Sequence, residues 1–215
     1  KLRFFSSRRR HTRCLSDWSS TCALPIYCLK IKVGVNPKLD IDRLAAVRKA
    51  VGDDVCIRID ANTAWEPKEA VRILNGMQEK GLQIELVEQP VKAHDLEGLK
   101  YVTENSYVPV LADESVFSPE DAVKIMQMRA ADLVNIKLMK CGGLYNALKI
   151  VSAAEVYGVE CMLGCMLEAK ISVNAAVELA CAKKIITKID LDNPRNRLLL
   201  QICFLLIQEK EPASD

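Results

Sequence analysis

The chain has 215 residues, of which 50% are hydrophobic and 5% aromatic, and its formal net charge is +2. The length suits one large α/β domain or two small ones with an aliphatic core. No stretch of eighteen uncharged apolar residues is present, which argues against a membrane partner, and the nine cysteines include no C-x-x-C pair. A transmembrane helix, a disulfide framework and a zinc site are therefore disfavoured. Free thiols indicate a reducing, cytoplasmic location.

The positive charge is confined to the start of the chain. Residues 1–27 hold six basic residues and one acidic residue, giving +5, whereas the remaining 188 residues give −3. A basic segment of this kind is typical of a nucleic-acid-binding arm or a targeting peptide. Residues 1–26, however, resemble the translation of a sequencing-library adapter. We therefore interpret residues 1–27 as a non-native, disordered leader and expect no nucleic-acid partner, with a basic arm as the alternative.

From residue 28 onward, short apolar runs alternate with longer amphipathic ones. Helical spacing is clear in the apolar stripe Ile41, Leu44, Val47 and Val51. Helix start signals such as Ser118-Pro119, and glycines near the expected helix ends, fit the same pattern. The predicted strands are residues 28–33, 55–60, 84–88, 110–112, 133–137, 160–163 and 185–190. Strands alternating with helices of this length indicate βαβ units and a parallel sheet.

Polar residues close the predicted strands at a regular interval. They are 28, 28, 25 and 24 residues apart in the order Lys32, Asp60, Glu88, Asp113 and Lys137. Asp190 follows 53 residues later, which corresponds to two more units. One βα unit per step places all of these side chains at the carboxyl edge of the sheet, where catalytic residues of a (β/α) barrel converge. A doubly wound open sheet would spread them along a line, and its glycine-rich first turn is not found.

Each polar group alone has an ordinary structural explanation. Asp60-Ala61-Asn62 could be a turn or a helix cap, and the alternating lysines Lys30 and Lys32 could face solvent on a strand. The five groups recur together at the ends of successive strands, and this shared position indicates a functional site instead. Three carboxylates at one edge repel one another, and a hard divalent cation such as Mg²⁺ relieves that repulsion. A lysine beside a cation is pushed toward the neutral amine, which can act as a general base.

Two such lysines on opposite sides of a substrate suit racemisation or epimerisation. One lysine would remove the α-proton, the other would return a proton to the opposite face, and the metal would stabilise the enediolate formed between the two steps. The sequence thus predicts Lys32 and Lys137 as the acid/base pair.

The same motifs resemble the enolase superfamily, in its muconate-lactonizing-enzyme subgroup, over residues 28–194. The motifs are Lys30-x-Lys32, Asp60-Ala-Asn62, Glu88-Gln-Pro90, Asp113-Glu-Ser115 and Lys137-Leu-Met-Lys140-Cys-Gly142-Gly143. The resemblance implies a TIM-like barrel with Mg²⁺ on Asp60, Glu88 and Asp113 and with Lys32 and Lys137 as acid/base residues. Lys30 and Asn62 would support them. Asp190-Leu-Asp192 resembles the Asp-x-Asp of dipeptide epimerases of the L-Ala-D/L-Glu type, which holds the dipeptide ammonium group.

The resemblance also implies parts that we do not find in this chain. Family members carry an N-terminal capping domain and a first barrel strand, and they commonly form homo-oligomers. We therefore expect an incomplete α/β barrel of about seven strands over residues 28–194, followed by an unassigned tail over 195–215. The predicted parent protein is a Mg²⁺-dependent dipeptide epimerase, and this chain is expected to be weakly active or inactive.

Two alternatives stay open. One is a sister activity, namely muconate cycloisomerisation, o-succinylbenzoate synthesis or N-acyl amino acid racemisation. Asp190 and Asp192 favour a cationic amine over a dianionic muconate. The other is a barrel remnant that folds but catalyses no reaction.

Overall fold

The structure is a computed structural model that describes residues 3–6 and 26–191. The strands are β1 (Arg3–Ser6), β2 (Ile26–Lys32), β3 (Cys56–Asp60), β4 (Ile84–Glu88), β5 (Val110–Ala112), β6 (Leu133–Lys137), β7 (Glu160–Gly164) and β8 (Ile186–Asp190). The helices are α1 (Pro37–Val51), α2 (Pro67–Glu79), α3 (Leu96–Asn105), α4 (Pro119–Met128), α5 (Leu138–Cys141), α6 (Leu144–Tyr157) and α7 (Lys170–Ala182). The alternation of strands and helices confirms the βαβ reading of the sequence.

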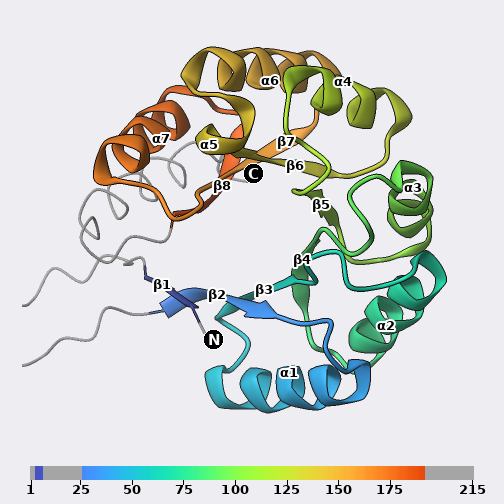
Figure 1. The fold of residues 1–215 in the computed structure, drawn as a ribbon. Coiled ribbons are helices and arrows are strands. Elements are labelled where there is room, and N and C mark those ends of the chain that lie inside the picture. The colour runs from blue at the N-terminus through green and yellow to red at the C-terminus, as the bar shows by residue number, and fades with distance from the viewer. Residues whose placement is uncertain (1–2, 7–25, 192–215) are drawn as a thin grey trace, which may run out of the picture.

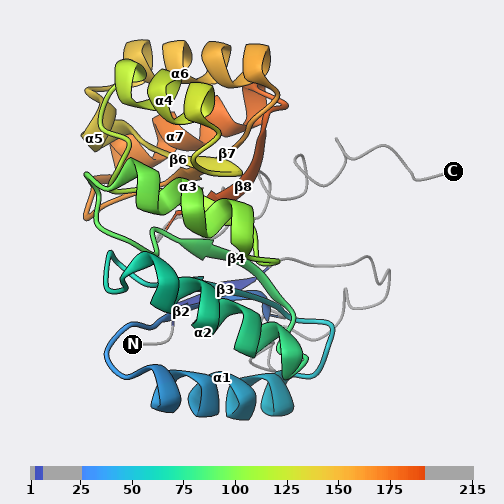
Figure 2. The same cartoon turned by 90° about the vertical axis from the view of Figure 1, so that its right-hand side faces the viewer.

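The strands form one curved sheet in the order β1 to β8, with helices along its outer face (Figure 1). Strands β2 to β8 are mutually parallel, so the expected incomplete barrel of seven parallel strands is confirmed. Figure 2 shows α1, α2, α3, α4 and α6 one above another along this face. The curved sheet forms an arc, and we call its two sides, β2–β4 and β6–β8, the limbs of the arc. Side chains bridge the two limbs. Lys30 Nζ on β2 lies 2.6 Å from Asp190 Oδ2 on β8, and Arg58 on β3 donates to the Ile189 carbonyl at 3.2 Å.

A short strand precedes the parallel set. β1 pairs antiparallel with β2, with Arg3 opposite Lys30 and Phe5 opposite Cys28. The sequence pattern predicts no strand before residue 28, whereas β1 lies in that segment and β2 begins at Ile26. The edge of β2 would otherwise present unpaired backbone groups, and an edge of that kind recruits an extended segment.

Helix caps explain where several helices begin. Pro37, Pro67 and Pro119 each lie in the first turn, where the missing N–H costs nothing. The Ser118 hydroxyl accepts a hydrogen bond from the Asp121 amide at 3.1 Å, as the Ser-Pro motif predicts. At the C-terminal end of α6, Gly158 adopts the left-handed conformation that ends the helix. Among the described residues, no helix combines the length and the apolar character needed to span a bilayer.

The alternation of side chains along the strands produces two apolar layers. One layer packs between the sheet and the helices and includes Ile57, Ile59 and Val87. The other is a small cluster of Leu86, Leu111, Leu133 and Met162, which lies on the inner face of the arc. Leu86 is two residues before Glu88, and Leu133 is four before Lys137. The inner apolar cluster therefore supports the polar residues at the carboxyl ends of the same strands.

Arg48, at the end of α1, joins the helix to the loops around it. Its buried guanidinium donates hydrogen bonds to the carbonyls of Leu82 (3.1 Å), Gly52 (2.8 Å), Val55 (2.6 Å) and Gln83 (3.0 Å).

We expect Arg48→Ala to lower the free energy of unfolding by about 3 kcal/mol, because these carbonyls lose a charged donor. Urea unfolding measures the loss. The exposed Arg72→Ala on α2 is the control, expected to stay within about 0.5 kcal/mol of the unmodified chain. Equal losses would contradict the role of Arg48.

Candidate active site

The strand register aligns the predicted residues at the carboxyl edge of the sheet. On one limb, Lys32 is the register partner of Asp60 on the neighbouring strand, and Asp60 is the register partner of Glu88 on the next. On the other limb Lys137 is level with Gly164, and Gly164 is level with Asp190. Asp113 follows directly after β5, between the two limbs. The regular spacing in the sequence thus correctly predicts a shared edge. Asp192 lies outside the described residues.

Lys30 lies among the carboxylates. Its ammonium group is 2.6 Å from Asp190 Oδ2 and 3.3 Å from Asp60 Oδ2, and it also contacts Glu88 Oε2. Burial alone would lower the pKa of Lys30, but Glu88, Asp190 and Asp60 together raise it well above its ordinary value. Lys30 is therefore a fixed positive charge that holds three strand ends together.

Lys137 and Lys140 both hold Asp113. Lys137 Nζ lies 2.5 Å from Asp113 Oδ2 and 3.7 Å from Glu88 Oε1. Lys140 contacts Asp113 Oδ1 and donates to the Asp113 carbonyl at 2.5 Å. Burial acts to lower the pKa of Lys137, and Asp113 and Glu88 outweigh it and raise that pKa. In this structure these contacts favour protonated Lys137, because its carboxylate neighbours bind it directly. The neutral amine expected beside a bound cation stays a prediction.

Lys32 and Asn62 lie together at the rim of the site. Lys32 Nζ is 2.6 Å from Asp60 Oδ2 and contacts Asn62 Oδ1. The Asn62 amide group donates to Glu114 Oε1 at 3.0 Å. The Lys32 side chain is 44% exposed, compared with 10% for Lys30. Of these two lysines, Lys32 is the more accessible to a substrate.

The carboxylates have the ligand chemistry that a hard divalent cation takes, although one oxygen from each of the three does not lie within 4.8 Å of the other two. Asp60, Glu88 and Asp113 are 1%, 1% and 3% exposed and come from consecutive strand ends. Burial raises the pKa of Glu88 to about 8 despite Lys30, and the charges of Asp60, Asp113 and Asp190 add to that rise. Burial also disfavours the charged form of Asp113, but Lys140 and Lys137 lower its pKa to about 2. Oxygen donors with this mutual repulsion are suited to Mg²⁺. In this structure, ammonium groups bridge the carboxylates.

Sequence reasoning missed three residues that hold the site. The fully buried Gln89 accepts hydrogen bonds from the Asp113 and Ser115 amides at 2.9 and 3.2 Å, and so fixes the loop that carries Asp113. The Asn135 amide donates to Glu88 Oε1 at 3.0 Å, and Lys140 holds Asp113. Asn135 is two residues before Lys137, so strand alternation could have placed it on the same face. The position of Gln89 depends on its left-handed backbone conformation (φ 37°). No sequence pattern predicts that conformation for a glutamine.

Comparison with known proteins identifies the family. A family model described as enolase C-terminal domain-like matches residues 24–201. This chain belongs to the enolase C-terminal domain-like family. The match confirms the family expected from the strand-end motifs.

The relatives of this family member include several dipeptide epimerases. An L-Ala-D/L-Glu epimerase from Clostridium acetobutylicum is 69% identical over 166 residues, which cover 77% of this chain and 46% of that protein. The substrate-liganded L-Ala-D/L-Glu epimerase of Bacillus subtilis has a TM-score of 0.77 at 51% identity, covering 79% of this chain and 47% of that one. The Enterococcus faecalis dipeptide epimerase complexed with Mg and L-Leu-L-Tyr has a TM-score of 0.74 at 51% identity, covering 76% and 46%. The chain spans about half the length of the relatives it matches.

The absence of a side chain at Gly164 leaves space for Asn135 and Lys137 at the carboxyl edge of the sheet. A Cβ atom at Gly164 would lie 2.8 Å from Asn135 Oδ1 and 3.1 Å from Lys137 Cε. We expect Gly164→Ala to lower the free energy of unfolding by about 1–3 kcal/mol, because the added methyl group displaces both side chains. The control is Gly76→Ala within α2, where a Cβ meets nothing within 4 Å and should raise stability by about 0.5–1 kcal/mol. Thermal unfolding of both variants checks the expectation, and equal stability would contradict the crowding at Gly164.

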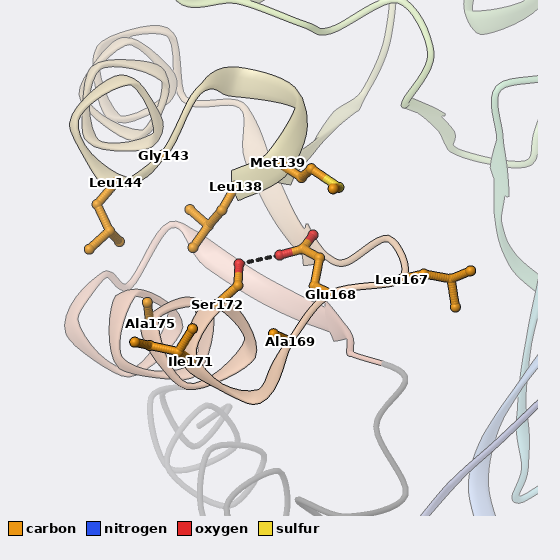
Figure 3. Close-up of a pocket in the computed structure, with 10 residues that line it drawn as sticks. All are labelled: Leu138, Met139, Gly143, Leu144, Leu167, Glu168, Ala169, Ile171, Ser172 and Ala175. Carbon is orange, nitrogen blue, oxygen red and sulfur yellow. Dashed lines mark hydrogen bonds between the residues drawn. The ribbon is translucent and has the colours of Figure 1, made fainter.

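An apolar cavity of about 420 Å³ adjoins the end of β6 (Figure 3). Its lining begins at Leu138 and Met139, directly after Lys137, and continues to Leu167 and Ile171. Its one charged lining residue, Glu168, accepts a hydrogen bond from the Ser172 hydroxyl and another from the Met166 amide at 2.9 Å. The cavity therefore adds apolar surface beside the site and no further acid/base pair.

Proposed function

We propose that this chain carries the catalytic edge of a Mg²⁺-dependent dipeptide epimerase and, of the two expectations for its activity, retains weak activity. The observation that carries the proposal is the placement of Lys32 and Lys137 on opposite limbs of the arc, with buried carboxylates between them. A substrate lying over the carboxylates would have one lysine on each side. This arrangement suits inversion at a single carbon by two opposed acid/base groups.

Asp60, Glu88 and Asp113 would hold the Mg²⁺ ion. When bound, it supplies positive charge beside the substrate carboxylate and offsets the negative charge that develops as the α-proton leaves. The residues around these three ligands have clear supporting roles. Gln89 fixes the Asp113 loop, and Asn135 orients Glu88 by its hydrogen bond.

The reaction itself is a proton transfer at one carbon. The neutral amine of one lysine takes the α-proton, so the C–H bond breaks and an N–H bond forms. The electron pair delocalises into the neighbouring carboxylate. The ammonium of the other lysine then donates a proton to the opposite face of the carbon. Lys32 and Lys137 exchange these two roles when the opposite stereoisomer binds.

Asp190 is the proposed partner of the dipeptide ammonium group. Its Oδ2 accepts from Lys30, whereas its Oδ1 is buried and accepts no hydrogen bond from the described residues. A buried carboxylate oxygen without a donor is suited to an ammonium group. We propose that Asp192 shares this role.

A second candidate is racemisation of an N-acyl amino acid. It is supported by an N-succinyl-L-Arg/Lys racemase from Bacillus cereus that is 41% identical over 166 residues, covering 77% of this chain and 44% of that protein. In an N-succinyl amino acid the acyl group ends in a carboxylate where the dipeptide carries its ammonium group, so we rank this activity second. Muconate cycloisomerisation ranks lower, because a dianion would lie beside Asp190.

A substrate comparison tests the proposal. The chain, at high concentration with Mg²⁺, is incubated with L-Ala-L-Glu, N-succinyl-L-lysine or muconate, and the products are separated by chiral chromatography. We expect L-Ala-D-Glu to form and the other two compounds to stay unchanged. Conversion of N-succinyl-L-lysine alone would replace the dipeptide assignment with the second candidate.

A further inference from the structure

A second cluster of ligand-type side chains lies at the opposite end of the strands. Cys28 on β2 is level with Cys56, the first residue of β3, and Glu85 is the second residue of β4. Cys28 is four residues before Lys32, which corresponds to about 13 Å along the strand. The cluster is therefore separate from the candidate active site.

The three side chains converge on one another. One ligand atom from each, two sulfurs and a carboxylate oxygen, all lie within 4.8 Å of one another. Among the residues that the structure describes, no other three histidine, cysteine or acidic side chains meet this condition. Cys56 Sγ donates to Glu85 Oε2 at 2.8 Å, and neither cysteine forms a disulfide. Zinc–sulfur bonds of about 2.3 Å require donor atoms roughly 3.5–4 Å apart, so small side-chain movements would complete a coordination shell.

The charges around the cluster suit a divalent cation. Two thiolates and one carboxylate carry three negative charges, and Arg58 contributes one positive charge through its contact with Glu85 Oε2 at 2.5 Å. A divalent cation brings the total to zero. Two further charges act on the cluster and are already paired. Lys188, which acts on Glu85, pairs with Glu160 at 3.0 Å. Asp190, which acts on Cys28, pairs with Lys30 at 2.6 Å. Arg58 also orients Glu85, as outer hydrogen-bond donors do for metal-binding carboxylates.

We propose that Cys28, Cys56 and Glu85 form a binding site for a thiophilic divalent cation of the Zn²⁺ type, with a solvent molecule in the fourth position. Thiolate ligands select zinc-like ions over Mg²⁺, which prefers oxygen ligands alone. Cys28 is buried, whereas Cys56 and Glu85 are partly exposed, so an ion could enter from this end of the strands. The chain would then bind a soft cation at one end and a hard cation at the other.

Cobalt provides the direct test, because Co²⁺ bound to thiolates has an intense sulfur-to-metal absorption band. The reduced 215-residue chain is titrated with Co²⁺ and then with Zn²⁺. We expect the band to appear, to vanish on addition of stoichiometric Zn²⁺, and to persist in a large excess of Mg²⁺. Absence of the band would overturn the proposal, as would its loss in Mg²⁺.

Variants assign the band to the cluster. Cys28→Ser and Cys56→Ser should each weaken Co²⁺ binding by roughly 100-fold or more, because a thiolate ligand is lost. Cys181→Ser on α7 is the matched control and should leave the titration unchanged. An unchanged titration in both cluster variants would place the metal elsewhere and overturn the proposal.

A footprint on the unmodified chain covers the case in which a variant fails to fold. Zn²⁺ should protect the partly exposed Cys56 from alkylation and leave the labelling of Cys181 unaltered, as measured by peptide mass spectrometry. Equal labelling of Cys56 with and without Zn²⁺ would overturn the site.

Discussion

Lys137→Arg is expected to slow α-proton exchange from one stereoisomer of the dipeptide by about 10²–10⁴-fold while the site stays assembled. Arginine keeps the positive charge beside Asp113, which Lys137 contacts at 2.5 Å, but its guanidinium does not give up its proton. The variant therefore removes proton transfer and retains the ion pair. Lys137→Ala would instead leave buried carboxylates short of a partner and destabilise the chain.

The measurement is deuterium incorporation at the α-carbon in D₂O, started separately from L-Ala-L-Glu and L-Ala-D-Glu. Lys32→Arg should impair exchange mainly from the stereoisomer that Lys137→Arg spares. Lys92→Arg is the control, because Lys92 is 58% exposed and pairs with Glu66 at 3.0 Å, away from the predicted catalytic residues. Equal losses for both stereoisomers in both site variants would contradict two opposed acid/base residues.

Glu88→Gln is expected to abolish the stabilisation of the chain by Mg²⁺. Binding of Mg²⁺ at one hundred times its dissociation constant should raise the free energy of unfolding of the unmodified chain by about 2.7 kcal/mol. Glu88 is the middle carboxylate of the three predicted ligands and is 1% exposed. Glutamine keeps its shape and removes its charge, so the cation would lose its central ligand.

The thermal unfolding temperature with and without Mg²⁺ measures this effect. Glu79→Gln, the same substitution at an exposed position at the end of α2, should retain the full Mg²⁺ response. A Mg²⁺ response in Glu88→Gln equal to that of the control would show that the cation binds elsewhere. Asp113→Asn provides a second test of the same ligand set, because it should also reduce the response.

Much of the fold could be predicted from the sequence because the strands are short, apolar and regularly spaced. The predicted strands at 84–88, 110–112 and 133–137 coincide with β4, β5 and β6. The shared edge followed from the 24- to 28-residue interval between strand-end polar groups. β1 could not be predicted, because it depends on the unpaired edge of β2 and on no pattern of its own.

The candidate site was predicted less completely than the fold. The sequence predicts that Lys30 supports Lys32, and this stays a prediction. The contact of Lys30 with Asp190 on the far limb spans 160 residues, and only the curvature of the sheet creates it. The cysteine cluster has no closely spaced cysteine pair that would indicate a metal site. Cys28 and Cys56 are 28 residues apart, the same interval that separates Lys32 from Asp60, so the strand repeat itself carried the signal.

Deuterium exchange with the unmodified chain tests the central claim most directly. The chain is first shown to bind Mg²⁺ by thermal unfolding and is then incubated with L-Ala-L-Glu in D₂O, followed by NMR. The proposed function predicts deuterium at the glutamate α-carbon and the appearance of L-Ala-D-Glu, both dependent on Mg²⁺. A chain that binds Mg²⁺ and the dipeptide yet incorporates no deuterium at that carbon would contradict it.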